Sequence, residues 1–151
     1  MPYRIRGGRL EVLIAHMGGP FWAGKDDGAW SIVKGEYEES EDAYAAARRE
    51  FEEETGTAPP EGPVLELGEV RQPRGKRIAA WAIESDFDAS RINSNTFTLE
   101  WPRGSGRQRE FPEIDRAAWC DPATAARKLV RGQVAFVEEL AGRLRAAGRI
   151  A

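Results

Sequence analysis

The order of the predicted elements indicates an α/β (α+β) fold in which a mixed β-sheet lies between helical layers. Three observations support this prediction. Apolar runs typical of strands lie within residues 3–16 and 64–85, a helical pattern spans residues 40–56, and an amphipathic helical pattern covers residues 133–147. The chain has 151 residues, of which 41% are hydrophobic, so we expect one domain, residues 1–151, with a substantial core.

The first third of the chain predicts a hairpin, a loop and a short strand. Gly7 and Gly8 separate an extended run at residues 3–6 from an aliphatic run at 9–16, which is apolar enough to be a central strand. Residues 18–28 are dense in turn formers, so we expect a loop there. A short strand over residues 29–33 follows it.

A helix is predicted between Ser40 and Gly56. Ser40 is suited to be its N-cap, and acidic residues follow in the first turn, near the positive end of the helix dipole. Ala43, Ala46, Ala47 and Phe51 recur at helical spacing, so we expect them to pack against the sheet. Gly56 is placed to end the helix as a C′ glycine.

The second half of the chain predicts further strands and two helices. Asp121 followed by Pro122 is typical of a helix start, with an N-cap and a proline in the first turn. The other predicted elements are strands at 64–70, 77–85 and 97–101, a basic turn at 71–76, a glycine- and arginine-rich loop at 102–112, and the terminal helix at 133–147.

Composition excludes several classes of function. The net charge of −3 argues against a protein that binds a long nucleic acid, but it is compatible with a small phosphorylated substrate held by a few arginines. No apolar stretch of about eighteen residues and no signal-like amino terminus is present, so we expect a cytoplasmic protein that does not bind membranes. Monomer and homodimer both stay open. The single cysteine, Cys120, and the single histidine, His16, predict neither a disulfide nor a zinc site.

An acidic stripe on the predicted helix is the most informative feature of the chain. At about 100° per residue, with Glu50 as zero, Glu54 lies at about +40° and Glu53 at about −60°, whereas Glu52 falls at about 200°. Each like-charged pair at such spacing costs a few tenths of a kcal/mol, so a cation would stabilise this face. A hard divalent ion such as Mg²⁺ suits carboxylate ligands. The alternative is a solvated acidic face, which is the usual meaning of a charge run.

The wider segment resembles the Nudix box, the signature of hydrolases that cleave a nucleoside diphosphate linked to another moiety. The motif positions are Gly35, then Glu41 after five residues, then, after seven more, Arg49, Glu50, Phe51, Glu53, Glu54 and Gly56. The last position, usually aliphatic, is Thr57 here. The resemblance implies a Nudix-type alpha/beta/alpha sandwich with a mixed central sheet. It follows the order of elements over nearly the whole chain, although only residues 35–57 are specific.

This resemblance also implies a set of metal ligands. Glu50, Glu53 and Glu54 are expected to bind Mg²⁺ (or Mn²⁺), and the carbonyl oxygen of Gly35 often joins them in the family. Glu41 would brace the loop or contact a further metal ion. The implied activity is that of a hydrolase acting on acid anhydrides in phosphorus-containing compounds.

The catalytic base is left open between two regions of the chain. In some members of the family it is a helix glutamate, here Glu53 or Glu50, and in others it comes from a later loop. Glu113 is the loop candidate, because its spacing to Trp119 resembles that of the tetraphosphate-cleaving members; an ordinary exposed glutamate is the alternative. Arg49 would orient the helix glutamates by ion pairing.

Residues ahead of the motif suggest contacts to a phosphate chain. The segment ahead of the motif has Trp30, then two residues, then Val33, Lys34 and Gly35. It resembles the sequence that precedes the motif in family members acting on diadenosine polyphosphates, diphosphoinositol phosphates and mRNA caps, with Val33 in place of the usual proline. Lys34 could meet a phosphate oxygen as a point charge. Arg71, Arg74, Lys76 and Arg77 could hold the distal phosphates of a long polyphosphate chain, or they could form a solvated hairpin tip.

Aromatic residues near the motif could stack on a purine. Phe21, Trp22 and Trp30 are the candidates, and such stacking is worth about 1–3 kcal/mol per base. Core packing is the more common role of a tryptophan.

These observations support one first hypothesis and several alternatives. The first is a metal-dependent Nudix pyrophosphohydrolase that cleaves a phosphoanhydride in a nucleoside polyphosphate, with a diadenosine polyphosphate as the first choice. Within the enzyme class, the alternatives are a nucleotide-sugar or ADP-ribose hydrolase and a nucleoside triphosphate pyrophosphohydrolase. Outside it, the alternative is a non-catalytic nucleotide-sensing module, against which the full glutamate set argues.

Overall fold

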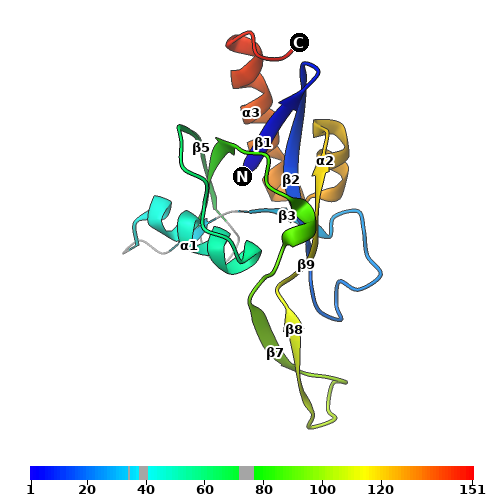
Figure 1. Cartoon of the computed structure of the whole chain (residues 1–151). Helices are drawn as coiled ribbons and strands as arrows, with labels where there is room; N and C mark the ends of the chain where they lie inside the picture. The colour runs from blue at the N-terminus through cyan, green and yellow to red at the C-terminus, as the bar shows by residue number, and fades with distance from the viewer. Residues whose placement is uncertain (34, 38–40, 72–76) are drawn as a thin grey trace.

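The structure, a computed structural model, describes residues 1–33, 35–37, 41–71 and 77–151 (Figure 1). In these residues a seven-stranded mixed sheet and a separate two-stranded sheet combine with three α-helices. This mixed architecture confirms the predicted fold class. No helix in the described ranges has both the length and the apolar character needed to span a membrane.

One α-helix lies between the strands, and two further α-helices follow the last strand. They are β1 (Pro2–Arg6), β2 (Arg9–Met17), β3 (Trp30–Ile32), β4 (Gly35–Tyr37), α1 (Ala43–Thr55), β5 (Val64–Arg71), β6 (Arg77–Glu84), β7 (Thr96–Glu100), β8 (Gln108–Pro112), β9 (Ile114–Cys120), α2 (Pro122–Lys128) and α3 (Val134–Ala146). Two short 3₁₀ helices lie at Ala89–Arg91 and Arg131–Gln133.

Strands β2 and β6 form the centre of the large sheet. β2 pairs antiparallel with β1, β3 and β9, and β6 pairs antiparallel with β4 and β5. The two halves join where β1 runs parallel to β6, with Pro2 opposite Ile83. Residues 12–15 of β2 are fully buried, which confirms the prediction of a central strand at residues 9–16. The predicted hairpin is also present, and Gly7 and Gly8 adopt the positive φ angles that its turn requires.

Helices cover both faces of this sheet. Because side chains alternate along a strand, Ile78, Ala80 and Ala82 of β6 share a face, and they pack in one buried cluster with Phe136 and Leu140 of α3. The neighbouring positions on β6, Ala79, Trp81 and Ile83, face α1 instead and line a pocket with Tyr44 and Phe51. The sheet therefore lies between α1 and the pair α2–α3, which accounts for its apolar strands.

Helix α1 begins two residues later than Ser40 would have placed it. Asp42 is the N-cap, since its carboxylate accepts a hydrogen bond from the Ala45 N–H at 3.0 Å. Ser40 itself lies outside the described residues. The predicted end is confirmed: Gly56 has φ 75° and donates its N–H to the Glu52 carbonyl at 2.8 Å. Of the four residues expected to pack against the sheet, Ala46 and Phe51 are buried, whereas Ala43 and Ala47 are only partly buried.

Three strands were not anticipated. The prediction of a loop over residues 102–112 is wrong for Gln108–Pro112, which forms β8 and pairs with β7 from Thr96↔Pro112 to Glu100↔Gln108. β9 pairs with β2 over Val12↔Cys120 to Met17↔Ile114, and β4 pairs with β6. The sequences of β4 and β8 have no run of apolar residues, and β9 has only the short run at residues 117–120, so the extended form of these segments depends on backbone pairing with partner strands.

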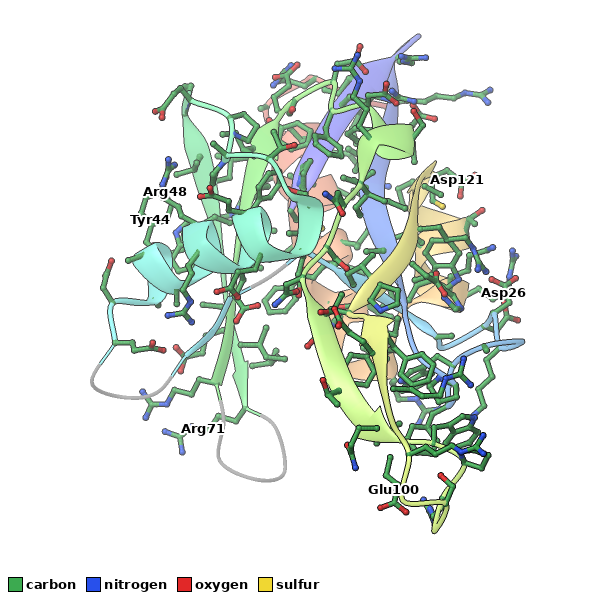
Figure 2. All side chains as sticks on the ribbon, turned by 60° about the horizontal axis from the view of Figure 1, so that its bottom comes forward. Asp26, Tyr44, Arg48, Arg71, Glu100 and Asp121 are labelled. Carbon is green, nitrogen blue, oxygen red and sulfur yellow. The ribbon has the colours of Figure 1, made fainter. Side chains whose placement is uncertain are left out.

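The β7–β8 hairpin projects from the body of the molecule. It forms the second sheet and carries Glu100 toward its outer end (Figure 1 and Figure 2). Phe97 and Phe111 face each other across its strands with ring centroids 5.9 Å apart. Phe21, from the loop between β2 and β3, meets Trp101 at the outer end of β7, with centroids 5.5 Å apart. The hairpin and this loop thus share a small aromatic cluster.

Gly56 generates a prediction about stability. A Cβ at Gly56 would overlap the Asn93 carbonyl oxygen, and φ is positive there, whereas Gly24 has a positive φ with open space around it. We expect Gly24→Ala to destabilise the fold by about 1 kcal/mol and Gly56→Ala by about 2–4 kcal/mol, because only the second also forces α1 away from residue 93. Urea unfolding of both variants measures the difference. Equal losses would contradict the close approach at Gly56.

Candidate active site

A cavity of about 360 Å³ lies between α1 and the base of the β7–β8 hairpin. Four glutamates contribute to its lining, and two further polar side chains and two apolar ones complete it. The lining residues are Met17, Ser31, Glu50, Glu53, Glu54, Asn95, Glu113 and Ile114. The volume lies within the range of small-molecule sites, which is about 300–1,000 Å³.

Helix α1 contributes one wall of this cavity. Glu50, Glu53 and Glu54 all line it, as the helical spacing predicts for residues on one side, whereas Glu52 is exposed and takes no part. The side chains of Glu50 and Glu53 are 24% and 43% exposed, so both reach the cavity from a partly solvated surface. The acidic stripe predicted on the helix is therefore one side of a concave site.

The facing wall comes from the junction of β8 and β9. Glu113 stands between these strands, and its backbone is held from two sides: its N–H donates to the Asn95 carbonyl at 2.9 Å, and its carbonyl accepts from the Gly18 N–H, also at 2.9 Å. Gly18 permits this approach, because a Cβ there would overlap the Pro112 carbonyl oxygen. Residue 113, remote in sequence from α1, thus shares a cavity with the helix glutamates.

Residues 93–95, here called the strap, tie the two walls together. The Asn93 N–H donates to the Thr55 carbonyl at 3.0 Å, and the Asn95 N–H donates to the Glu53 carbonyl at 2.7 Å. Both acceptors lie in the last turn of α1, where helix carbonyls have no partner within the helix. The strap therefore satisfies the end of α1 and carries the Asn95 carbonyl to Glu113.

Arg49 lies beside the acidic wall. Its guanidinium donates to Glu41 at 3.0 Å and lies 3.7 Å from a Glu50 carboxylate oxygen and 3.8 Å from a Glu53 oxygen. The hydrogen bond to Glu41, with the nearby carboxylates, raises the pKa of Arg49 further, so it stays charged. This one cation contacts three carboxylates and offsets part of their mutual repulsion.

Most of the donors around the cavity are hard oxygen atoms. Among the described residues, four carboxylates, an amide and the Ser31 hydroxyl line it; the thioether of Met17 is the one soft donor, and no thiol or imidazole is present. Hard oxygen donors suit Mg²⁺ or Mn²⁺. Within the described ranges, no three His, Cys, Asp or Glu side chains are grouped closely enough to hold a metal ion. The chemistry of the donors fits a hard divalent ion, while the carboxylates stand around the cavity and do not converge on one point.

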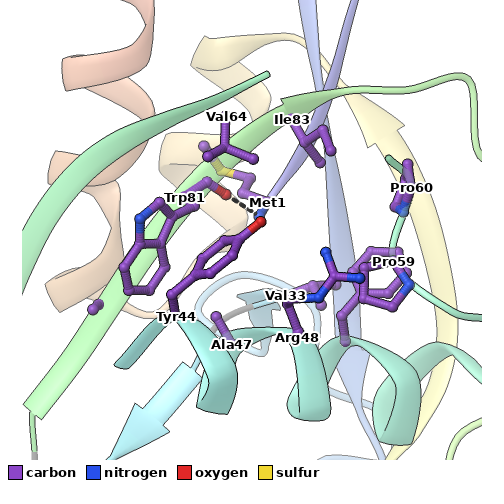
Figure 3. Close-up of a pocket in the computed structure, with 12 residues that line it drawn as sticks. Met1, Val33, Tyr44, Ala47, Arg48, Pro59, Pro60, Val64, Trp81 and Ile83 are labelled. Carbon is purple, nitrogen blue, oxygen red and sulfur yellow. Dashed lines mark hydrogen bonds between the residues drawn. The ribbon is translucent and has the colours of Figure 1, made fainter. Parts of the chain in front are cut away.

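A second, smaller cavity of about 40 Å³ lies on another side of α1 (Figure 3). It is lined mainly by apolar and aromatic residues, among them Tyr44 and Trp81, whose rings lie 5.3 Å apart. The Met1 amino group donates to the Trp81 carbonyl at 2.6 Å. Burial lowers the pKa of this amino group to about 5, although the Glu54 carboxylate works in the opposite direction. Among the residues that the structure describes, no carboxylate lines this cavity.

The aromatic residues singled out in the sequence do not line the carboxylate cavity. Trp30 is only 4% exposed and donates its indole N–H to Asp26 at 2.8 Å. Cations cover its ring, since the Arg116 guanidinium and the Lys128 ammonium both lie 5.1 Å from the ring centroid. Trp22 packs partly buried against the core.

Phe21 differs from these tryptophans because 46% of it is exposed. Its partner Trp101 was not singled out in the sequence, since it follows a strand pattern with no motif around it.

Some of the predicted site residues are not among those that the structure describes. Lys34, Arg74 and Lys76 lie outside the described residues. Gly35 is described as part of β4, where it pairs with Ala79. The structure adds Asn95, Ser31 and Met17 to the cavity lining, none of which was singled out in the sequence. Because strands that meet only in the folded chain bring these residues together, no local pattern could have identified them.

His16 is held inside the fold, outside the cavity. It is 1% exposed, its Nδ1 lies 2.9 Å from an Asp115 oxygen, and its Nε2 lies 2.7 Å from the Lys25 carbonyl. These contacts join β2, β9 and the loop between β2 and β3.

Comparison with known proteins places this geometry in a family. Residues 3–140 match the family described as the NUDIX domain. No curated protein matches the chain closely enough to count as a relative. Two of the similar solved structures are the C. elegans Ap4A hydrolase binary complex (TM-score 0.59, 15% identity, 96% of this chain and 93% of that one) and the E. coli ORF135 protein in solution (TM-score 0.53, 21% identity, 97% and 88%). A second structure of the C. elegans Ap4A hydrolase has a TM-score of 0.52 at 15% identity and covers 95% of this chain and 92% of its own.

At these identities the structural likeness is one of fold, and it agrees with the mixed sheet and the three helices described above. The family match shows more than fold, because it is a match to a family model and it extends over residues 3–140. Nudix hydrolases act on pyrophosphate bonds in small-molecule nucleotide substrates and generally use divalent metal ions. The chain belongs to the NUDIX domain family and is a hydrolase of this kind.

Proposed function

We propose that this protein is a Mg²⁺- or Mn²⁺-dependent pyrophosphohydrolase that cleaves a phosphoanhydride in a nucleoside polyphosphate at the carboxylate cavity. The observation that supports this most is the lining of that cavity, which combines Glu50, Glu53 and Glu54 from α1 with Glu113 from the junction of β8 and β9. A phosphate chain brings several negative charges, so a site built from carboxylates can accept it only together with cations.

In this proposal Glu50, Glu53 and Glu54 hold the ion, with the Gly35 carbonyl as a further ligand and Glu41 as a brace or an additional ligand. When bound, the divalent ion supplies the positive charge that neutralises phosphate oxygens. Arg49 keeps the helix carboxylates oriented, since it contacts Glu41, Glu50 and Glu53 at once.

Glu113 is the proposed general base. Its side chain is exposed to the cavity and its backbone is held at both the N–H and the carbonyl, so the carboxylate is accessible to a water molecule while its position is restricted. A positioned base contributes about 10²–10⁴-fold to such a reaction by taking the proton of the attacking water. Glu53 or Glu50 in this role remains the alternative.

A diadenosine polyphosphate is the first substrate to test. The segment from Trp30 to Gly35 favours it, and the C. elegans Ap4A hydrolase shares the fold, although 15% identity says nothing of substrate. Phe21, which is 46% exposed and lies against the partly buried Trp101, offers aromatic surface for a base. Lys34, Arg74 and Lys76 are proposed phosphate contacts, and Trp22 stays a candidate for stacking. Because Trp30 is buried and capped by cations, we infer a packing role for it.

Substitution of the helix glutamates tests the metal assignment. Glu53→Gln removes one charge at the cavity and keeps the side-chain volume, so we expect kcat to fall by about 10²-fold or more, with an unchanged melting temperature. Glu52→Gln is the matched control, because Glu52 is the same residue type, next in sequence, and exposed away from the cavity. Steady-state kinetics at saturating Mg²⁺ compares the two. If Glu52→Gln lost as much activity as Glu53→Gln, general acidity of the helix would explain the effect and the assignment would fail.

A substrate panel in ¹⁸O-labelled water tests the reaction. We expect phosphoanhydride cleavage in Mg²⁺ or Mn²⁺, loss of turnover with EDTA, and recovery when the ion is restored. Mass spectrometry of the products identifies the linkage and the attacked phosphorus. ATP released from diadenosine tetraphosphate supports the first choice, whereas AMP from ADP-ribose or from a nucleoside triphosphate indicates one of the alternative substrates. Saturable nucleotide binding without turnover in either ion would favour the sensing module and overturn the proposal.

A further inference from the structure

The strap, residues 93–95, makes a contact to β9 that ordinary strand pairing does not explain. The Ser94 hydroxyl oxygen accepts the Ile114 N–H at 3.0 Å and lies 3.0 Å from the Ile114 carbonyl oxygen. It also lies 2.9 Å from the Asn95 carbonyl oxygen. The hydroxyl has one hydrogen, so it donates to one of these two carbonyls at a time while it accepts from Ile114. The Ser94 side chain thus makes the hydrogen bond to the Ile114 N–H that the backbone of a neighbouring strand would otherwise make.

This contact is next to Glu113. Ile114 is the following residue and is 6% exposed, so its peptide group is part of the packed interior. On the other side of Glu113, its own N–H is bonded to the Asn95 carbonyl. The strap therefore holds both peptide groups that adjoin Glu113: the Ile114 N–H donates to the Ser94 hydroxyl, and the Glu113 N–H donates to the Asn95 carbonyl. Asn95 is in turn bonded to the Glu53 carbonyl at 2.7 Å, which makes a short connection from Glu113 to α1.

We propose that Ser94 is a positioning residue for Glu113: its hydroxyl holds the peptide that follows Glu113 and thereby fixes the distance between that carboxylate and the glutamates of α1. The inference rests on the proposed function, in which Glu113 acts on the attacking water. The relation between two walls that are remote in sequence depends on the strap, and Ser94 is its only side chain with a hydrogen bond to residue 114 among those the structure describes.

Removal of the hydroxyl separates positioning from general stability. In Ser94→Ala the Asn93 and Asn95 backbone bonds to α1 are still available, so the strap stays attached while Ile114 loses its side-chain partner. We expect kcat to fall by about tenfold or more, because small displacements of a reacting group reduce the rate steeply, with KM little changed. Ser94→Thr keeps a hydroxyl and should restore most of kcat.

Ser90→Ala is the matched control. Ser90 precedes the strap by three residues, and its hydroxyl bonds to the exposed Asp88 at 2.6 Å, away from the cavity. We expect its kcat to equal that of the unmodified protein. A loss of kcat in Ser90→Ala as large as that in Ser94→Ala would overturn the inference, because the effect would then belong to the whole segment.

A double-mutant cycle with Glu113→Gln provides the decisive readout. If Ser94 acts through Glu113, Ser94→Ala should lower kcat in the unmodified protein and have little further effect in Glu113→Gln. The same fold-loss in both backgrounds would indicate a structural role and overturn the inference. Should Ser94→Ala fail to fold, Ser94→Cys, which keeps the volume with a weak donor, replaces it in the cycle.

The cycle also distinguishes this inference from the proposed function. Loss of activity in Glu113→Gln with full activity in Ser94→Ala would leave the proposed function intact and reject the role of Ser94. Full activity in Glu113→Gln would reject Glu113 as the base, and the positioning role with it, while the Glu53 experiment still tests the metal site independently.

Discussion

Mutual repulsion among the carboxylates around one cavity is the constraint on which the rest of this structure depends. Glu50, Glu53 and Glu54 come from one side of α1, and Glu113 approaches from the opposite wall. The guanidinium of Arg49 moderates the repulsion in the structure, since it contacts Glu41, Glu50 and Glu53. A divalent ion would do so more strongly, and a phosphate chain would complete the balance of charge. Such a site favours a polyanion that arrives with its metal.

Backbone contacts keep the two acidic walls in register. The last turn of α1 offers unpaired carbonyls, and the strap uses two of them while presenting its own carbonyl to Glu113. Glycine is required at two of the close approaches, at Gly18 beside Pro112 and at Gly56 beside Asn93. The geometry of the site is therefore set largely by main-chain hydrogen bonds.

What could be predicted from the sequence follows from how local each feature is. The acidic stripe and the end of α1 were predictable, because helical periodicity and a C-terminal glycine act within a few residues. β8 and β9 were not, because Gln108–Pro112 has no apolar run, the run in Ile114–Cys120 is confined to residues 117–120, and both segments are extended through pairing with β7 and β2. Asn95 could not have been identified either, because only the folded chain brings it to the cavity. Asp42 displaced Ser40 as the N-cap, a choice between two suitable residues two positions apart.

The tryptophans show a different limit of prediction from the sequence. A sequence pattern can indicate that Trp30 is near a functional segment, but it cannot indicate whether the ring is available. Only the folded chain shows that Trp30 is 4% exposed and that two cations lie over its ring. Trp101, which no motif marks, is the aromatic residue that the fold brings to Phe21.

Anomalous diffraction from crystals soaked in Mn²⁺ tests the central claim most directly, because it locates the ion independently of turnover. The account predicts a manganese peak in the cavity between α1 and Glu113, at about 2.0–2.3 Å from carboxylate oxygens of Glu50, Glu53 or Glu54. An empty cavity at saturating Mn²⁺, with a nucleotide polyphosphate bound elsewhere on the protein, would contradict it.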